Sequence, residues 1–90
     1  MTIKFDNGKR DATLLARGLD FAQCDAVFSG LTLTQRDDRV EYGEERFITF
    51  GLLDAPWVVL VWTPRGANRR IISMRFANER EIKKYADGVD

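Results

Sequence analysis

Arginine is the residue type best suited to chemistry in this sequence. Arginines outnumber lysines ten to four, and the chain contains no histidine. The planar guanidinium group donates paired hydrogen bonds that match the oxygens of a phosphate. Cleavage of a phosphodiester would lack the usual imidazole acid and base. Arginines would stabilise the charge of a pentacoordinate phosphorane, and a carboxylate or lysine with a shifted pKa would transfer the proton.

Polar side chains interrupt a segment that otherwise indicates a buried strand. Residues Arg69–Ala77 alternate, so we expect Ser73 and Arg75 to share a face with Ile71, opposite Met74. A sheet face that carries cations can hold an extended anionic strand. The simpler interpretation is a strand arginine that keeps its charge in water.

A carboxylate lies beside an arginine in the motif Gly43-Glu44-Glu45-Arg46, at the start of another predicted strand. Such a carboxylate could take a proton from a ribose 2′-hydroxyl. More often the pair is a surface ion pair worth well under ~1 kcal/mol. A one-residue register error would exchange Glu44 and Glu45.

Two further cations lie at element ends. Arg65 is in a predicted hairpin tip, where an exposed cation is normal. Lys9 begins a predicted helix, where its charge opposes the helix dipole. That small local cost hints at another use for Lys9.

The single cysteine, Cys24, excludes an internal disulfide, and without histidine no familiar zinc spacing remains. We therefore expect neither a metal site nor a cofactor. Because no histidine can activate it, we interpret Cys24 as a small core residue.

Composition predicts one domain spanning residues 1–90, with 44% hydrophobic residues available for a core. Fourteen cationic side chains balance fourteen anionic ones, so any nucleic-acid site must be a local patch. The longest apolar run, Ala55–Trp62, is too short to span a bilayer, and the N-terminus does not have the pattern of a signal segment. These features predict a cytoplasmic protein.

Local patterns predict an α+β protein with an antiparallel sheet of about four to five strands, two N-terminal helices and one C-terminal helix, packed mainly on one side. The first strand covers Thr2–Phe5. The first helix covers Lys9–Arg17, with Leu14 and Leu15 facing inward and Gly18 ending it.

The second helix begins at Asp20, with Gln23 in the capping-box position, and ends at Gly30. The last helix is capped by Asn78, with Glu81 in the box position. Between them lies an antiparallel meander with the third apolar run at its centre. Its predicted strands are Leu31–Thr34, Glu44–Leu53, Trp57–Trp62 and Arg69–Ala77.

Five pieces in order resemble the BrnT toxin family, and the resemblance runs from Phe5 to Tyr85. The pieces are Phe5-Asp6 followed by Lys9, Gly18-Leu19-Asp20-Phe21 with Val27-Phe28, Gly43-Glu44-Glu45-Arg46, Val59-Leu60-Val61-Trp62-Thr63 with Arg65, and Arg70-Ile71-Ile72-Ser73-Met74-Arg75-Phe76-Ala77 with Glu79-Arg80.

The resemblance implies a RelE-like fold and a ribonuclease that halts translation. It also implies neutralisation by a BrnA-like antitoxin with a ribbon-helix-helix DNA-binding part, so that DNA is contacted only through the antitoxin. The resemblance implies charged, function-linked side chains at Lys9, Glu44 or Glu45, Arg46, Arg65 and Arg75. The roles are our own assignment: Arg75 and Arg65 as phosphate and transition-state binders, Glu44 as base, Lys9 as electrostatic help, and Arg46, Arg70 and Ser73 as RNA contacts.

One departure from the family pattern falls at the end of the first helix. Family members commonly have Lys-His-Gly there, whereas this chain has Ala16-Arg17-Gly18. Arg17 can still stabilise the helix C-terminus through its charge.

Three functions remain open at this point. The first is a metal-independent endoribonuclease acting on messenger RNA. The second is a non-catalytic co-repressor that acts only with its ribbon-helix-helix partner. The third is an RNA-binding domain that stacks bases on exposed aromatic side chains, although these are more often core residues. The aromatic candidates are Trp57, Trp62, Phe47 and Phe50.

Overall fold

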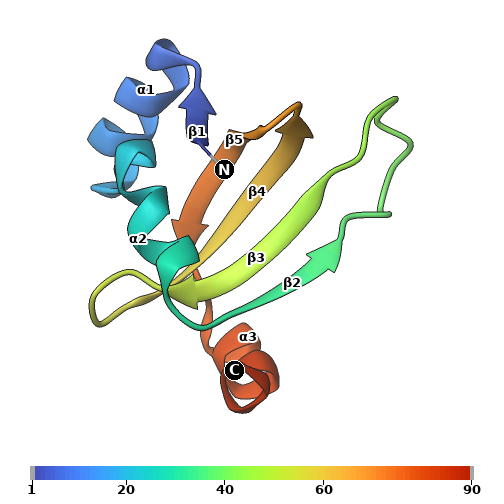
Figure 1. The fold of residues 1–90 in the computed structure, drawn as a ribbon. Helices are drawn as coiled ribbons and strands as arrows, with labels where there is room; N and C mark the ends of the chain where they lie inside the picture. The colour runs from blue at the N-terminus through green and yellow to red at the C-terminus, as the bar shows by residue number, and fades with distance from the viewer. Residues whose placement is uncertain (1, 90) are drawn as a thin grey trace.

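The computed structural model describes residues 2–89 and consists of one five-stranded sheet with three α-helices (Figure 1). The predicted α+β class is therefore confirmed. The strands are β1 (Thr2–Phe5), β2 (Thr32–Arg36), β3 (Phe47–Leu52), β4 (Trp57–Arg65) and β5 (Asn68–Phe76). The helices are α1 (Asn7–Arg17), α2 (Cys24–Ser29) and α3 (Glu79–Tyr85), with 3₁₀ turns η1 (Phe21–Gln23) and η2 (Ala86–Gly88).

The strand order is β1-β5-β4-β3-β2, so β4 is central, as predicted from its apolar run. Strands β2 to β5 form the expected antiparallel meander. However, β1 pairs with β5 in parallel, which makes the sheet mixed rather than antiparallel. Because the chain leaves β1 through helices instead of a hairpin, β1 is free to join the far edge in the parallel direction.

Helix α1 ends before Gly18 as the sequence predicts, but it begins at Asn7, two residues before the predicted start at Lys9. The Asp6 carboxylate accepts a hydrogen bond from the Lys9 amide at 2.8 Å, and Gly18 takes a left-handed conformation with φ +71°. The expected inward face was wrong, because Leu14 is 38% exposed and Leu15 is 91% exposed. Among residues 7–17 the less exposed side chains are Arg10 and Thr13, one turn apart.

The second predicted helix is broken into two short pieces. Asp20 does cap it, accepting from the Ala22 amide at 2.9 Å, but residues 21–23 form a 3₁₀ turn and only Cys24–Ser29 is α-helical. The predicted apolar stripe holds, since Phe21, Cys24 and Val27 are all buried. The helix arrangement therefore differs from the predicted pair of regular N-terminal helices.

One face of the sheet, which we call the packed face, holds the core. Gly51 in β3 allows α2 to approach closely, because a Cβ there would lie 2.9 Å from a Val27 methyl. The core is closed by edge-to-face contacts of Phe5 with Phe21 and of Phe28 with Trp62. Its buried members are Leu19, Phe21, Cys24, Val27, Leu53, Val58, Leu60, Trp62, Ile71 and Met74.

A β-bulge in β5 changes which side chains share a face. Val61 pairs with Ser73 but the next residue, Trp62, pairs with Ile71, so Ile72 is the extra residue. Ile71 and Met74 consequently both belong to the core, at 1% and 0% exposure. The prediction that Ile71 shares a face with Arg75 assumed unbroken alternation and was wrong.

The opposite face, which we call the open face, carries the side chains that alternate with the core. Val59, paired with Arg75, lies on it beside Phe50 of β3. Helix α3 reaches this face through the Tyr85 ring, 5.7 Å from the ring of Phe50. Figure 1 shows α1 and α2 together on one side of the sheet and α3 apart from them, so the helices do not share one side as predicted.

No helix within residues 2–89 is long and apolar enough to cross a membrane.

Candidate functional site

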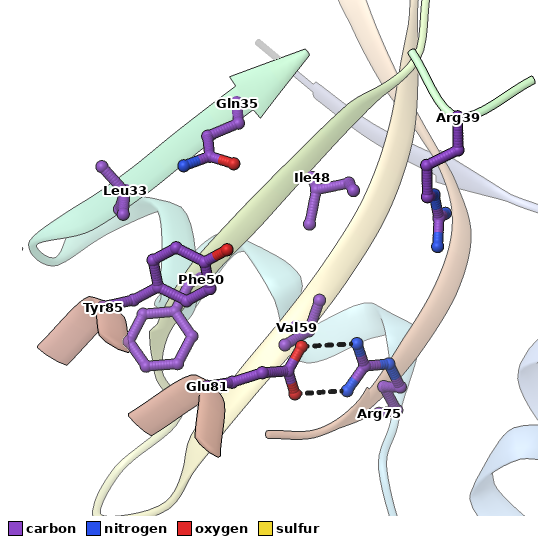
Figure 2. Close-up of a pocket in the computed structure, with 9 residues that line it drawn as sticks. All are labelled: Leu33, Gln35, Arg39, Ile48, Phe50, Val59, Arg75, Glu81 and Tyr85. Atoms are coloured by element: carbon purple, nitrogen blue, oxygen red, sulfur yellow. Dashed lines mark hydrogen bonds and ion pairs between the residues drawn. The ribbon is translucent and has the colours of Figure 1, made fainter. Parts of the chain in front are cut away.

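A cavity of about 120 Å³ lies between the open face and α3 (Figure 2). Its apolar floor comes from β2, β3 and β4, and its polar groups come from β2, β5, α3 and the loop after β2. The lining residues are Leu33, Gln35, Arg39, Ile48, Phe50, Val59, Arg75, Glu81 and Tyr85.

Arg75 is held in this cavity by a two-pronged pair with Glu81. Its Nη1 and Nη2 atoms donate to the two carboxylate oxygens, each at 2.8 Å. Glu81 is itself fixed, because the Asn78 amide donates to it at 3.0 Å in the predicted capping box. Hydrogen bonding to Arg75 lowers the pKa of Glu81 to about 2 and raises the pKa of Arg75. The Arg75 guanidinium is therefore held in a fixed orientation, but the two Nη atoms that form its fork already donate to a carboxylate.

A second pair positions Arg39 at the other side of the cavity. The Asp37 side chain is fully shielded from solvent and accepts from Nε and Nη2 of Arg39, each at 2.8 Å. The Tyr42 hydroxyl donates to the same carboxylate at 3.2 Å. Hydrogen bonding to Arg39 lowers the pKa of Asp37 to about 2. Nη1 of Arg39 takes no part in the pair, and Figure 2 shows the guanidinium pointing toward the Arg75 side of the cavity.

The predicted residues Glu44, Arg46 and Arg65 form a separate cluster. Glu44 lies 3.2 Å from Nη2 of Arg65 and 3.8 Å from Nε of Arg46. The Arg46 guanidinium stacks 4.0 Å from the centre of the Tyr42 ring. The loop between β2 and β3 forms a hollow here, and Arg39 lines both this hollow and the cavity.

Distance along the strands separates Arg65 from Arg75. Arg65 pairs with Asn68 at one end of the hairpin, whereas Val59, six residues earlier in β4, pairs with Arg75. At the usual rise per residue, six strand positions span about 20 Å. One phosphodiester cannot contact both side chains closely, but a strand of several nucleotides can.

Lys9 and Ser73 meet in a third place, a shallow depression between α1 and β5. Arg17, which stands where the family commonly has histidine, donates to the Met74 carbonyl at 2.9 Å. That carbonyl lies beyond the part of β5 that pairs with β1, so Arg17 binds the sheet edge. Arg70 pairs with Thr63 across the β4–β5 ladder, outside the cavity lining.

Of the seven predicted site residues, the structure thus brings Glu44, Arg46 and Arg65 together in one cluster and Lys9 and Ser73 in another. Arg75 has partners that the sequence did not reveal. Arg39 and Asp37 lie between two predicted strands and were not singled out, and Glu81 was assigned only to a helix cap. The spacing Asp37-x-Arg39 was the available signal for the loop pair. Nothing in the local pattern signals that Glu81 reaches Arg75.

Residues predicted to be structural are buried. Cys24 is fully buried, and burial raises the pKa of its thiol to about 12, which suits a core residue rather than a nucleophile. Trp62 and Phe50 are 8% and 3% exposed. Base stacking on these two rings, as the RNA-binding-domain hypothesis requires, is therefore not available at the surface.

A packed sheet face combined with an open face carrying arginine–carboxylate pairs around a cavity defines a small α+β domain with an arginine-lined recognition surface. Comparison with protein families then gives its identity. The model described as "Ribonuclease toxin, BrnT, of type II toxin-antitoxin system" matches residues 5–81, so the chain belongs to this family, as its motifs predicted. Membership implies an antitoxin partner. No curated protein matches the chain.

Proposed function

We propose that this protein is a metal-independent endoribonuclease that cleaves messenger RNA in the cytoplasm and thereby inhibits translation. Family membership supports the ribonuclease activity. The observation that carries the proposal is the cavity of the open face, where Arg39 and Arg75 line the same space. Two guanidinium groups there can bind a phosphodiester and stabilise the charge that grows on it.

The ion pair between Arg75 and Glu81 determines the order of RNA binding and proton transfer. A phosphodiester oxygen must replace Glu81 in the fork of Arg75, because both of its Nη atoms now donate to that carboxylate. Without its arginine partner, Glu81 regains proton affinity, since the pair is what lowers its pKa to about 2. Glu81 then accepts the proton of the 2′-hydroxyl as that oxygen attacks phosphorus. The P–O5′ bond breaks, a 2′,3′-cyclic phosphate forms, and the leaving 5′-oxygen takes a proton from water.

The Glu44 cluster binds the same RNA strand further along. Glu44, predicted as the base, lies with Arg65 at the far end of the open face, so in this proposal Arg65 and Arg46 hold a flanking phosphate and Glu44 orients them. Arg70, Ser73 and Lys9 extend the contact along β5 and α1. The partner that neutralises the toxin is a BrnA-like ribbon-helix-helix antitoxin, through which alone the complex contacts DNA.

The test is incubation of the purified protein with messenger RNA in the presence of EDTA, with and without ribosomes. We expect cleavage that survives chelation. Arg75→Ala should slow it by about 10²–10³-fold, as loss of one transition-state donor does. Arg80→Ala is the matched control, because Arg80 is an exposed arginine of α3 outside the cavity lining, and it should leave the rate unchanged.

RNA that stays intact with the folded protein, ribosomes included, would contradict the nuclease. That result would favour the second hypothesis, a non-catalytic co-repressor. Expression of the Arg75→Ala variant would separate them further, since a co-repressor without catalysis would affect growth equally with and without Arg75.

A further inference from the structure

The cavity on the open face has room for more than a phosphate. Its volume is about 120 Å³, somewhat less than the cavity of about 150 Å³ that holds benzene in another protein, so part of one planar base can enter it while the rest stays in solvent. Aliphatic side chains of Leu33, Ile48 and Val59 and the rings of Phe50 and Tyr85 line it. A phosphate needs none of these apolar walls, whereas an aromatic ring is stabilised by them.

The polar groups of the cavity are divided between two sides. In Figure 2, Gln35 lies on β2 on one side and Arg39 and Arg75 lie on the other, with Ile48 and Val59 between them. The register supports this view, because Gln35 pairs with Ile48 and both project from neighbouring strands onto the open face. An amide offers a donor and an acceptor, whereas the guanidinium groups offer donors only.

We infer that the cavity binds one nucleobase of single-stranded RNA, next to the phosphodiester held by Arg39 and Arg75, and that Gln35 reads the edge of the base. This inference rests on the proposed function. It adds a physical reason why the proposed nuclease would prefer some RNA sequences over others. Single-stranded RNA is read by apolar contacts to the base together with hydrogen bonds to exposed base edges, and this cavity offers apolar walls and the Gln35 amide.

The Gln35 amide favours a base edge that presents a donor beside an acceptor. A glutamine amide can form two hydrogen bonds with such an edge, as it does with N6 and N7 of adenine. A base that presents two acceptors, as guanine does with O6 and N7, leaves one amide atom without a partner. The charge also favours a nucleotide over an apolar protein segment, because the guanidinium groups at the mouth match a phosphate.

The test uses binding rather than cleavage. A short 2′-O-methyl RNA cannot react and reports affinity alone. Leu33→Trp should fill the cavity and weaken binding at least tenfold. Leu31→Trp is the matched control, because Leu31 is 65% exposed and does not line the cavity, and it should bind as the unmodified protein does. Gln35→Ala should remove the preference of the protein among the four bases, measured with homopolymeric RNAs, while retaining most of the affinity.

The outcomes separate the two proposals. Weaker binding by Leu33→Trp together with no cleavage by the unmodified protein would sustain the nucleobase site and remove the nuclease. Equal binding by Leu33→Trp and Leu31→Trp, with cleavage intact, would overturn the nucleobase site alone. If Leu33→Trp unfolds at a lower temperature than the unmodified protein, the Gln35→Ala variant decides. An unchanged base preference in Gln35→Ala would then overturn the nucleobase site.

The antitoxin is the competing occupant, and the same variants exclude or reveal it. Leu33→Trp that binds RNA normally but no longer binds the purified antitoxin would assign the cavity to the antitoxin and overturn the inference.

Discussion

Neighbouring residues of β5 project onto opposite faces of the sheet and lie in different environments. On the packed face, Met74 is fully buried, and Leu60, with which it pairs, is equally inaccessible. On the open face, the next residue, Arg75, has a side chain that is 42% exposed and pairs with Val59. One strand therefore supplies both a core side chain and a candidate phosphate ligand. Stability and recognition can consequently be altered separately, one residue apart.

The charges of the open face differ from those of a preformed anion site. Arg39 and Arg75 are each already paired with a carboxylate, and both carboxylates have a pKa lowered to about 2, so they stay charged at neutral pH. In the proposed function, RNA must displace these internal carboxylates from the two arginines. In contrast, the buried core residues of the packed face named above all have uncharged side chains.

The largest effect is expected at Glu81. Glu81→Gln removes the proposed base, so the turnover rate should fall by about 10²–10⁴-fold. It also removes the carboxylate that occupies the fork of Arg75, so an uncleavable RNA should bind more tightly than to the unmodified protein. Single-turnover cleavage and equilibrium binding measure the two changes.

Opposite signs in rate and affinity are what distinguish Glu81 from a residue that merely supports the fold. The matched variant is Glu79→Gln, an exposed acid in the same turn of α3, which should change neither quantity. A Glu81→Gln protein that cleaves at the normal rate would transfer the role of base to Glu44, which Glu44→Gln then tests.

A substitution on the packed face should reduce stability and leave RNA cleavage unchanged. Leu60→Ala deletes a fully buried side chain from the central strand, and such deletions cost about 2–5 kcal/mol of unfolding free energy. Denaturant unfolding measures the loss. Below the unfolding transition, RNA cleavage should be unchanged, because Leu60 projects away from the cavity.

Arg75→Ala is the contrasting variant, since it removes an exposed ion pair worth at most about 1 kcal/mol. Comparable stability losses in Leu60→Ala and Arg75→Ala would mean that the two faces are not separable.

The predictability of the two faces also differs. Apolar periodicity gave the central strand, the buried stripe of α2 and the burial of Cys24, because these depend on local pattern. It failed at Leu15, since adjacent leucines cannot both face the sheet from one helix, and at Ile71, since the bulge that moves it is a property of the β4–β5 ladder. The parallel pairing of β1 with β5 likewise depends on tertiary structure and not on local pattern.

The sequence predicted that arginines lie on the open face, but it did not predict which carboxylates pair with them. The abundance of arginine and the Glu44–Arg46 proximity followed from composition and short spacing. The Arg75–Glu81 pair depends on where α3 folds back, and the Asp37–Arg39 pair on a loop that buries a carboxylate against expectation. The partners in both pairs are close in the sequence, but their contact is determined by how α3 and the loop fold onto the sheet.

The smallest effect concerns acid. Asp37 and Glu81 have folded-state pKa values of about 2, below their ordinary values of 3.8 and 4.5. The unfolded chain therefore binds protons before the folded one does, so the stabilisation is complete above about pH 5 and is lost as the pH falls toward 2. The partner guanidiniums are 67% and 42% exposed, so screening limits the loss to about 1–2 kcal/mol.

Denaturant unfolding between pH 2 and pH 6 tests whether the open face supplies this pH dependence. Asp37→Asn should be less stable at pH 6 and should show a shallower loss toward pH 2, because its uncharged amide no longer titrates. Asp87→Asn, a substitution of an exposed acid, should keep the slope of the unmodified protein. If Asp37→Asn retains the full slope, the buried carboxylate does not hold the β2–β3 loop, and Arg39 would then lack the fixed position that the recognition surface requires.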